Sequence, residues 1–330
     1  MNGKILVTGG AGFIGFHLAR ALAADGYRVD LLDNLGRGVR DSELERLLDG
    51  GGVRLLQADL CDPAAAAALD DDYRQIYHLA AIIGVVHVLG RPYEVLRDNT
   101  LMLANVIDLG RRQKALDRLL FASTSEVYAG SVARLDLPVP TPEDAVIALP
   151  GLDQPRTSYM LSKLYGEAMC LQSGLPVSII RPHNVYGPRM GMAHVVPELL
   201  AKAYRSPEGG ALPVASVDHS RAFCHVDDAV AMIRALMAAP EGLGQVVNLG
   251  RQEEITIGAL AEIIVATVGR RLTVAATAAT AGSPSRRCPD MARMTRLTGV
   301  TAGIGLAEGV ACTFAWYRAN VFDGAGACAT

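Results

Sequence analysis

Short apolar runs alternate in the first half of the chain with longer runs in which apolar positions recur every three or four residues. The short runs predict buried strands and the periodic runs predict amphipathic helices. This alternation predicts a doubly wound parallel α/β sheet. The expected strands are Lys4–Thr8, Arg28–Leu32, Val53–Gln57, Gln75–His78, Arg118–Ala122 and Val177–Ile180, and the expected helices are Phe13–Ala24, Ser42–Leu48, Pro63–Leu69, Tyr93–Gln113 and Ser158–Ser173.

The pattern loosens after Arg181, where proline and glycine punctuate the chain. Helix Val226–Ala238 and strand Val246–Leu249 predict a return to the sheet, and further helices are expected at Val195–Arg205, Ala259–Val268 and Leu306–Arg318. We therefore expect a nucleotide-binding domain at 1–180 and 225–250. A smaller, discontinuous substrate-binding lobe is expected at 181–224 and 251–330, with a cleft where the strands end.

Composition narrows the classes of function. The chain has 330 residues, 50% of them hydrophobic, and a net charge of −3, which gives no basic footprint for nucleic acid. No apolar stretch reaches membrane-spanning length, and the sequence runs directly into the first strand without a signal peptide. Six scattered cysteines without a Cys-x-x-Cys pair predict reduced thiols in a cytoplasmic protein, and no metal site is expected: Cys61, Cys170, Cys224, Cys288, Cys312 and Cys328.

A glycine-rich turn joins the first predicted strand to the first predicted helix. Gly9 and Gly10 permit a tight turn, Gly12 permits close approach of a pyrophosphate, and Gly15 permits close packing of helix on strand. Phe13 and Ile14 open the helix, whose N–H groups and dipole attract phosphate. Strand, glycine turn and helix in this order predict a Rossmann-type dinucleotide site.

The second strand ends in Asp33, eighteen residues beyond Gly15. An acid at this place accepts hydrogen bonds from the adenosine ribose and repels a 2′-phosphate, so NAD is favoured over NADP. Arg37 lies close to Asp33 in sequence, so some use of NADP stays open.

Two groups of polar residues carry candidate chemistry. Tyr159 and Lys163 are four residues apart on one predicted helix and share a face, and an ammonium near a phenol favours the phenolate. Thr124-Ser125-Glu126 follows a buried strand, which places hydroxyls and a carboxylate at its carboxyl end. Glu126 as a loop carboxylate without a chemical role is the alternative. Asp227-Asp228 opens a helix, where acids favour the dipole, so we predict a structural role for this pair.

These motifs together resemble the extended short-chain dehydrogenase/reductases that act on nucleotide sugars as epimerases, dehydratases or decarboxylases. The resemblance covers nearly the whole chain. It rests on TGGAGFIG at 8–15, HLAA at 78–81, STSEVY at 123–128, YMLSK at 159–163, RPHNVYGPRM at 181–190, RAFCHVDDA at 221–229 and RRCPD at 286–290.

The resemblance implies a role for each matching residue. Tyr159 would be the base at the sugar C4 hydroxyl, assisted by Thr124, while hydride passes to NAD, and Lys163 would also hold the nicotinamide ribose. Beside Gly9, Gly12, Phe13, Ile14, Gly15 and Asp33, the cofactor-binding residues would be Asn34, Asp59, Leu60, Ala80, Ala81 and Asn99. The substrate-binding residues would be Asn184, Arg189, Arg221 and Arg287, although Arg221 and Arg287 could also be ordinary surface charges. A homodimer through helices Tyr93–Gln113 and Ser158–Ser173 is implied as well.

The reaction that follows C4 oxidation depends on the residue beside Thr124. Members that act as 4,6-dehydratases usually carry Asp where this chain has Ser125, and plain 4-epimerases usually lack the glutamate. Thr-Ser-Glu is most similar to UDP-glucuronate decarboxylases. A 4-epimerase, a dehydratase using Glu126, and a non-catalytic NAD-binding regulator stay open. His183 and the apolar run Ile82–Leu89 are unusual beside a charged uronate, so the sugar also stays open.

Overall fold

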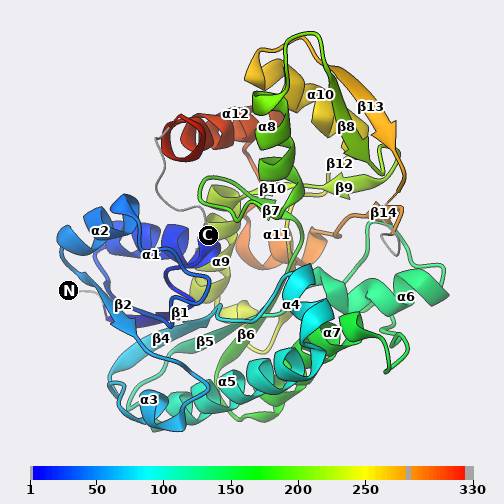
Figure 1. Cartoon of the computed structure of the whole chain (residues 1–330). Coiled ribbons are helices and arrows are strands. Elements are labelled where there is room, and N and C mark those ends of the chain that lie inside the picture. The colour runs from blue at the N-terminus through cyan, green and yellow to red at the C-terminus, as the bar shows by residue number, and fades with distance from the viewer. Residues whose placement is uncertain (1–2, 280–283, 324–330) are drawn as a thin grey trace.

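A seven-stranded parallel sheet forms the centre of the larger domain (Figure 1). The computed structural model describes residues 3–279 and 284–323. The strand order is β11-β6-β5-β4-β1-β2-β3, which reverses direction between β1 and β4 as in a doubly wound sheet. The strands are β1 (Lys4–Thr8), β2 (Arg28–Asp33), β3 (Val53–Gln57), β4 (Tyr73–His78), β5 (Arg118–Ala122), β6 (Val177–Pro182) and β11 (Val246–Leu249).

Helices cover both faces of this sheet because its central strands are apolar on both sides. Ile5 and Val7 of β1 enter one hydrophobic cluster, whereas Leu6 between them enters the other. The first cluster lies under α1 (Phe13–Ala24), α2 (Ser42–Asp49) and α9 (Val226–Ala238), and the second lies under α3 (Pro63–Ala67), α5 (Pro92–Arg112) and α7 (Pro155–Gln172).

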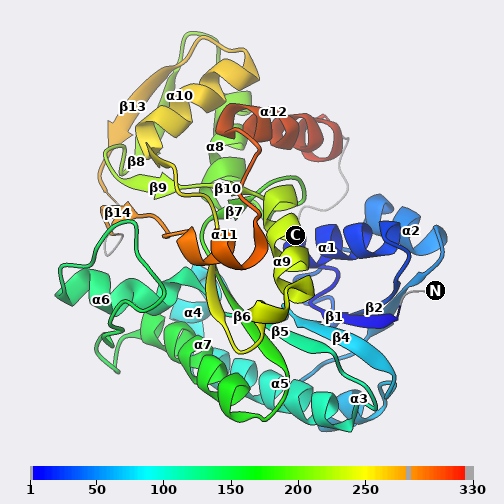
Figure 2. The same ribbon diagram turned by 180° about the vertical axis from the view of Figure 1, so that it is seen from behind.

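A second lobe lies above the carboxyl ends of the strands (Figures 1 and 2). Its core joins segments far apart in sequence, with Leu200, Leu260 and Val310 buried together. Its elements are α8 (Val195–Arg205), α10 (Ile257–Val268), α12 (Leu306–Tyr317) and η3 (Arg318–Phe322), the parallel pair β8 (Ala211–Ala215) and β13 (Thr273–Thr277), and the sheet β12 (Glu254–Thr256), β9 (Ser220–Ala222) and β14 (Arg286–Arg287). The short strands β7 (Val185–Tyr186) and β10 (Cys224–His225) pair beside it.

The predicted strands and long helices form within a few residues of their expected bounds, and the predicted fold class is confirmed. Short elements were not predicted: α4 (Val85–Gly90), η1 (Ser125–Tyr128), α6 (Ala129–Arg134), η2 (Pro240–Gly242) and α11 (Ala292–Thr298). The domain bounds stay a prediction, to which the structure adds one detail. Met291 precedes α11 and Met294 lies in it, and both are buried in the hydrophobic cluster under α1 and α9. The sequence prediction places this segment in the smaller lobe.

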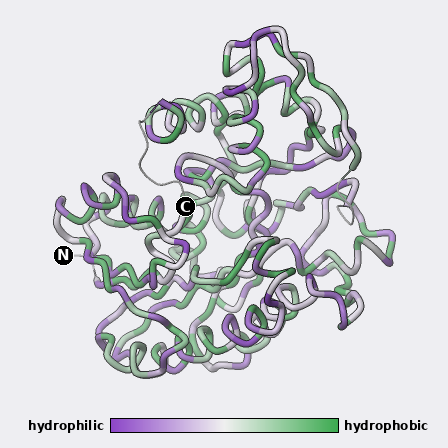
Figure 3. The backbone as a smooth tube through the Cα atoms, viewed as in Figure 1, coloured by the Kyte–Doolittle hydropathy of each residue, from purple (hydrophilic) through white to green (hydrophobic). Residues whose placement is uncertain are grey.

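Hydrophobic positions recur along the central strands and along one side of the flanking helices (Figure 3). Within residues 3–279 and 284–323, no helix is both long and apolar enough to cross a membrane. The cysteines of the described residues carry free thiols, and Cys328 lies outside them.

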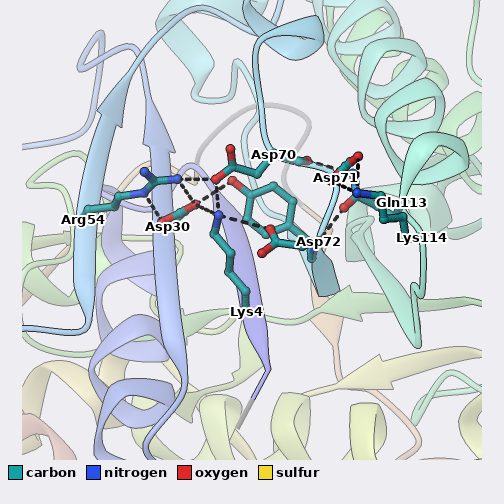
Figure 4. A network of polar contacts seen from close by, with 9 residues as sticks. Lys4, Asp30, Arg54, Asp70, Asp71, Asp72, Gln113 and Lys114 are labelled. Atoms are coloured by element: carbon teal, nitrogen blue, oxygen red, sulfur yellow. Dashed lines mark hydrogen bonds and ion pairs between the residues drawn. The ribbon is translucent and has the colours of Figure 1, made fainter. Parts of the chain in front are cut away.

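A charged network connects the amino-terminal halves of four neighbouring strands (Figure 4). Asp30 of β2 is 3% exposed and accepts two hydrogen bonds from Arg54, at 2.5 and 2.7 Å. The Tyr73 hydroxyl donates to the same carboxylate at 2.6 Å, and the Lys4 ammonium lies 3.4 Å away. Lys4 also pairs with Asp70. This buried carboxylate therefore joins β1, β2, β3 and β4.

Replacing Asp30 with asparagine should lower the free energy of unfolding by roughly 2–4 kcal/mol, because buried donors and Lys4 would lose their charged partner. Urea denaturation measures the change. Asp108→Asn is the control, since its ion pair with Arg111 is exposed and should contribute less than about 1 kcal/mol. Equal losses in the two variants would contradict the assignment.

Candidate active site

The glycine turn between β1 and α1 has the shape of a phosphate cradle. Gly9 has a φ of 69°, in the region that favours glycine. A Cβ on Gly15 would lie 2.2 Å from the Gly9 carbonyl oxygen, so helix and turn approach as closely as only glycine permits. Gly12 is the N-cap of α1 and no side chain caps the helix, which leaves the N–H groups of its first turn, at Phe13 and Ile14, to an anion. These residues fit the pyrophosphate of NAD.

Polar side chains gather where β2 and β3 end. Asp33 accepts hydrogen bonds from the backbone N–H of Ala11 at 3.1 Å and of Leu35 at 2.8 Å. Burial raises the pKa of the Asp33 carboxyl, and these two hydrogen bonds oppose the rise. Asn34 donates to Asp59 at 3.2 Å, and Leu60 is buried next in sequence. The structure thus brings the predicted adenosine-binding residues to one edge of the sheet.

The segment that follows β4 lies beside the glycine turn, on the side away from β2. The N–H of Ala80 donates to the Thr8 hydroxyl at 3.3 Å, which places Ala80 and Ala81 beside the glycine turn. Asn99 of α5 binds both backbone groups of Ile82, at 2.7 and 3.1 Å, and also donates to the Ser162 hydroxyl at 3.2 Å. Direct cofactor binding by Asn99 stays a prediction, because these hydrogen bonds show it holding this segment in place.

Tyr159 and Lys163 lie on α7, close to the end of β5. The Lys163 ammonium is buried, donates to the Ala122 carbonyl at 2.8 Å and lies 4.9 Å from the Phe121 ring centroid. Burial lowers the pKa of Lys163 to about 8. The same ammonium is 6.0 Å from the centroid of the Tyr159 ring, as their shared helix face requires.

Burial raises the pKa of Tyr159 to about 12, while its hydrogen bond with Thr124 and the charge of Arg37 oppose this rise. Arg37, on the loop after β2, is thus a second cation near the phenol, and the role of Lys163 beside it stays a prediction. The sequence indicated Arg37 only as a possible NADP contact. No local signal in the sequence shows that its charge lies near Tyr159.

The turn Thr124-Ser125-Glu126 continues from β5 into η1. The Thr124 hydroxyl accepts the N–H of Glu126 at 3.2 Å, and Ser125 is buried. The Glu126 carboxylate receives a hydrogen bond from Arg287 at 2.6 Å, across 161 residues of sequence. Glu126 also raises the pKa of Tyr159, so the carboxylate lies within electrostatic reach of the phenol.

Arg287 and Arg221 lie side by side, because β14 pairs with β9 in the register Arg287↔Arg221. Arg287 is only 17% exposed at its side chain, so it is not an ordinary surface charge. Burial and the positive charge of Arg287 lower the pKa of Arg221 to about 10. Asn184 donates to the Ala222 carbonyl at 3.0 Å and so lies beside β9. Two neighbouring arginines, one of them paired with Glu126, are an arrangement suited to an anionic substrate.

Characterised proteins resemble this chain in sequence and in fold. Residues 5–250 match the model of the NAD-dependent epimerase/dehydratase family. The chain belongs to this family. It is 33% identical to UDP-glucuronic acid decarboxylase 1 of Xenopus tropicalis over 322 residues, 96% of this chain and 72% of that protein. It is 31% identical to UDP-N-acetyl-alpha-D-glucosaminuronate decarboxylase of Bacillus cytotoxicus, with 80% of each chain covered.

Solved structures agree. An NAD-dependent NDP-hexosamine 5,6-dehydratase of tunicamycin biosynthesis, TunA, superposes with a TM-score of 0.79 at 30% identity, covering 98% of this chain and all of that one. A UDP-galactose 4-epimerase gives the same TM-score at 26% identity and covers 96% of this chain and 99% of that one. The protein is an NAD-dependent enzyme of the epimerase/dehydratase family, which confirms the predicted family and cofactor.

One predicted substrate residue of this family member makes other contacts. Arg189 is 4% exposed at its side chain and donates to Asp41 at 2.8 Å and to the Val39 carbonyl at 3.0 Å. Its guanidinium covers the Phe16 ring at 4.0 Å. The predicted substrate contact stays a prediction, because these contacts show the Arg189 side chain bound to residues of α1 and of the loop before α2.

A buried ion pair that the sequence analysis missed supports the catalytic turn of the enzyme. Arg181 of β6 binds both carboxylate oxygens of Glu167, at 2.9 and 2.7 Å, and both side chains are at most 8% exposed. The Ser123 hydroxyl donates to Glu167 at 2.5 Å. A signal did exist, since Glu167 follows Lys163 by four residues on α7 and Arg181 interrupts an apolar strand.

The lowered pKa of Lys163 predicts how stability depends on pH. Between about pH 8, the pKa of Lys163 in the folded protein, and 10.5, the ordinary pKa of lysine, the unfolded chain binds more protons than the folded chain, so stability rises with pH. Between pH 7.5 and 9.5, the free energy of unfolding of the native enzyme should rise by roughly 1–2 kcal/mol relative to that of Lys163→Met. Lys114→Met is the control, because Lys114 is exposed at 74%. Parallel pH profiles for the native enzyme and Lys163→Met would contradict the shift.

Proposed function

We propose that this enzyme decarboxylates a nucleotide-linked uronic acid, with UDP-glucuronate as the best candidate substrate. The observation that carries the proposal is the Glu126–Arg287 pair, whose carboxylate lies within electrostatic reach of Tyr159. The similarity of the whole chain to UDP-glucuronic acid decarboxylase 1 supports it. The residues that hold NAD would be the glycine turn, Asp33, Asn34, Asp59, Leu60, Ala80 and Ala81.

The first step would oxidise the sugar at C4. NAD, when bound, supplies the acceptor for the C4 hydride and the donor that later returns it. Tyr159, as phenolate, removes the C4 hydroxyl proton, while Thr124 donates a hydrogen bond to the same oxygen. Lys163 and Arg37 supply the positive charge that a buried phenolate needs.

The second step would remove the carboxylate. A C4 ketone makes the uronate a β-keto acid, and breaking the C5–C6 bond sends the electron pair to the C4 oxygen as an enolate and releases CO₂. Tyr159 and Thr124 hold the enolate oxygen with hydrogen bonds. Glu126 or Arg287 delivers a proton to C5. Tyr159 then protonates the C4 oxygen as the ketone is reduced, so the net change replaces the carboxylate with a proton.

A dehydration across C5 and C6 is the second candidate. The 30% identity to the NDP-hexosamine 5,6-dehydratase over the full chain favours it, as does the apolar segment from Ile82 to Leu89. The same C4 ketone would acidify the C5 proton, and Glu126 would remove it while the C6 hydroxyl leaves. A 4-epimerase would use the ketone alone. The co-location of Thr124, Tyr159 and Lys163 speaks against a non-catalytic NAD-binding regulator.

Mass spectrometry separates these reactions. Purified enzyme with NAD and a panel of UDP-, dTDP- and GDP-sugars, including UDP-glucuronate and UDP-N-acetylglucosamine, should release CO₂ from a uronate. Loss of water from a neutral sugar would establish the dehydratase instead, and an unchanged mass at a new retention time would establish an epimerase.

Glu126→Gln tests the residue that carries the proposal. We expect kcat to fall by roughly 100-fold, within the range for a lost general acid or base. Glu45→Gln is the matched control, because Glu45 pairs with Arg40 on the outer surface of the nucleotide domain. Full turnover by Glu126→Gln would show that the assignment is wrong.

A homodimer through α5 and α7 belongs to the same proposal. The two helices pack against each other and leave apolar or aromatic side chains exposed, including Leu101 at 37% and Tyr165 at 59%. We expect light scattering to show a dimer, and Tyr165→Glu to shift it towards monomer because a buried carboxylate would be unpaired. Leu243→Glu, at an exposed residue outside both helices, should leave the dimer intact. A monomeric native protein would refute the dimer.

A further inference from the structure

Arg189 attaches the smaller lobe to the loop that follows β2. Its Nε donates to Asp41 and its Nη2 donates to the carbonyl of Val39, at 2.8 and 3.0 Å. Asp41 also caps α2 by accepting the N–H groups of Glu43 and Leu44. A residue from the lobe thus holds both the end of the loop and the beginning of the next helix.

This loop, residues 34–41, forms part of the cofactor site. The N–H of Val39 donates to the carbonyl of Ala11 in the glycine turn, at 3.3 Å. Gly38 lies so close that a Cβ on it would be 2.7 Å from both the Ala11 Cβ and an Asp33 carboxylate oxygen. The N–H of Leu35 binds the other side of the site through Asp33, at 2.8 Å. The position of the loop therefore fixes both the phosphate turn and the acid that faces the ribose.

Helix α12 makes a second attachment nearby. The Trp316 indole N–H donates to Glu43 of α2 at 2.8 Å. The hydroxyl of the next residue, Tyr317, donates to the carbonyl of Met190, which follows Arg189 in sequence. One helix of the lobe thus holds α2 directly and also holds the segment that carries Arg189.

The protein accepts strain and a lost hydrogen bond to make this contact. Arg189 and Leu35 have φ angles of 64° and 58°, in the left-handed region that costs a non-glycine residue about 1 kcal/mol. The Nη1 of Arg189 is buried without a hydrogen-bond partner among the described residues. Strained residues persist where surrounding contacts force them, and they concentrate at ligand clamps and other functional sites.

We propose that Arg189 is a latch that locks loop 34–41 over bound NAD, so that the cofactor stays in the enzyme between turnovers. The latch consists of Arg189 with Asp41 and Val39, supported by Trp316 with Glu43. Arg189 is a positioning residue, since it acts on NAD through the loop. The inference requires the NAD cofactor alone and holds for any of the sugar reactions considered above.

The test measures how fast the cofactor leaves. Enzyme freed of nucleotide and loaded with NADH is mixed with a large excess of NAD⁺, and the decay of NADH fluorescence gives the dissociation rate. Arg189→Ala should release NADH at least about tenfold faster, since it removes two charge-assisted hydrogen bonds that hold the loop closed. A merely structural role would lower the thermal unfolding temperature and leave the dissociation rate of the folded enzyme unchanged.

Matched variants keep the test decisive. Arg271→Ala removes an exposed arginine whose partner, Glu208, lies in the same lobe, so NADH should leave at the native rate. Trp316→Phe keeps an aromatic ring and loses the hydrogen bond to Glu43, so it should speed release by a few fold even if Arg189→Ala does not fold. The inference is overturned if folded Arg189→Ala, or in its absence Trp316→Phe, releases NADH at the native rate. Equal acceleration by Arg271→Ala overturns it as well.

Discussion

The ion pair between Glu167 and Arg181 holds α7, the helix of the proposed base, against β6. Both side chains are almost fully buried, so separating the two would leave an uncompensated charge inside the protein. Glu167 belongs to the helix of Tyr159 and Lys163, and through Ser123 it also holds the residue that precedes Thr124. The helix cannot slide along the strand end without breaking this pair. The position of Tyr159 relative to Thr124 therefore depends on the contacts that Glu167 makes with Arg181 and Ser123.

The same hydrogen-bond network extends from Arg181 towards the segment that carries Arg287. Arg181 also donates to the Tyr128 hydroxyl at 2.7 Å, which donates to Asn248 at 3.0 Å. The amide of Asn248 then donates to the carbonyls of Thr141 and Asp290, at 2.9 and 3.2 Å. Asp290 lies three residues after Arg287, so Glu126 and its arginine partner are held by one buried polar frame although 161 residues separate them. Such a frame costs little only when its polar groups are satisfied.

Sequence patterns predicted what local periodicity controls. The sequence predicted the seven strands of the large sheet and the helices α1 and α7, because their hydrophobic positions repeat with the period of a strand or a helix. Helix α11 was not, since seven residues give too short a pattern and its burial depends on α9. The directions of Arg37 and Arg189 were also out of reach. A long side chain can reach several sites from one backbone position, and tertiary packing alone selects among them. Motif resemblance therefore drew attention to Arg287 but gave no sign that Arg189 binds the loop before α2.

The charges around Tyr159 bear on how one site could carry out the two proposed proton transfers, at C4 and at C5. In the proposed reaction Tyr159 must be a phenolate to accept the C4 hydroxyl proton, yet burial and the Glu126 carboxylate both raise its pKa. A free carboxylate would therefore oppose the oxidation it is meant to follow. Pairing Glu126 with Arg287 at 2.6 Å offsets its charge while keeping it within electrostatic reach of Tyr159. Arg37 adds positive charge on the other side of the phenol. In the proposed decarboxylation, the salt bridge would thus allow the C4 base and the C5 acid to lie close together without each suppressing the other.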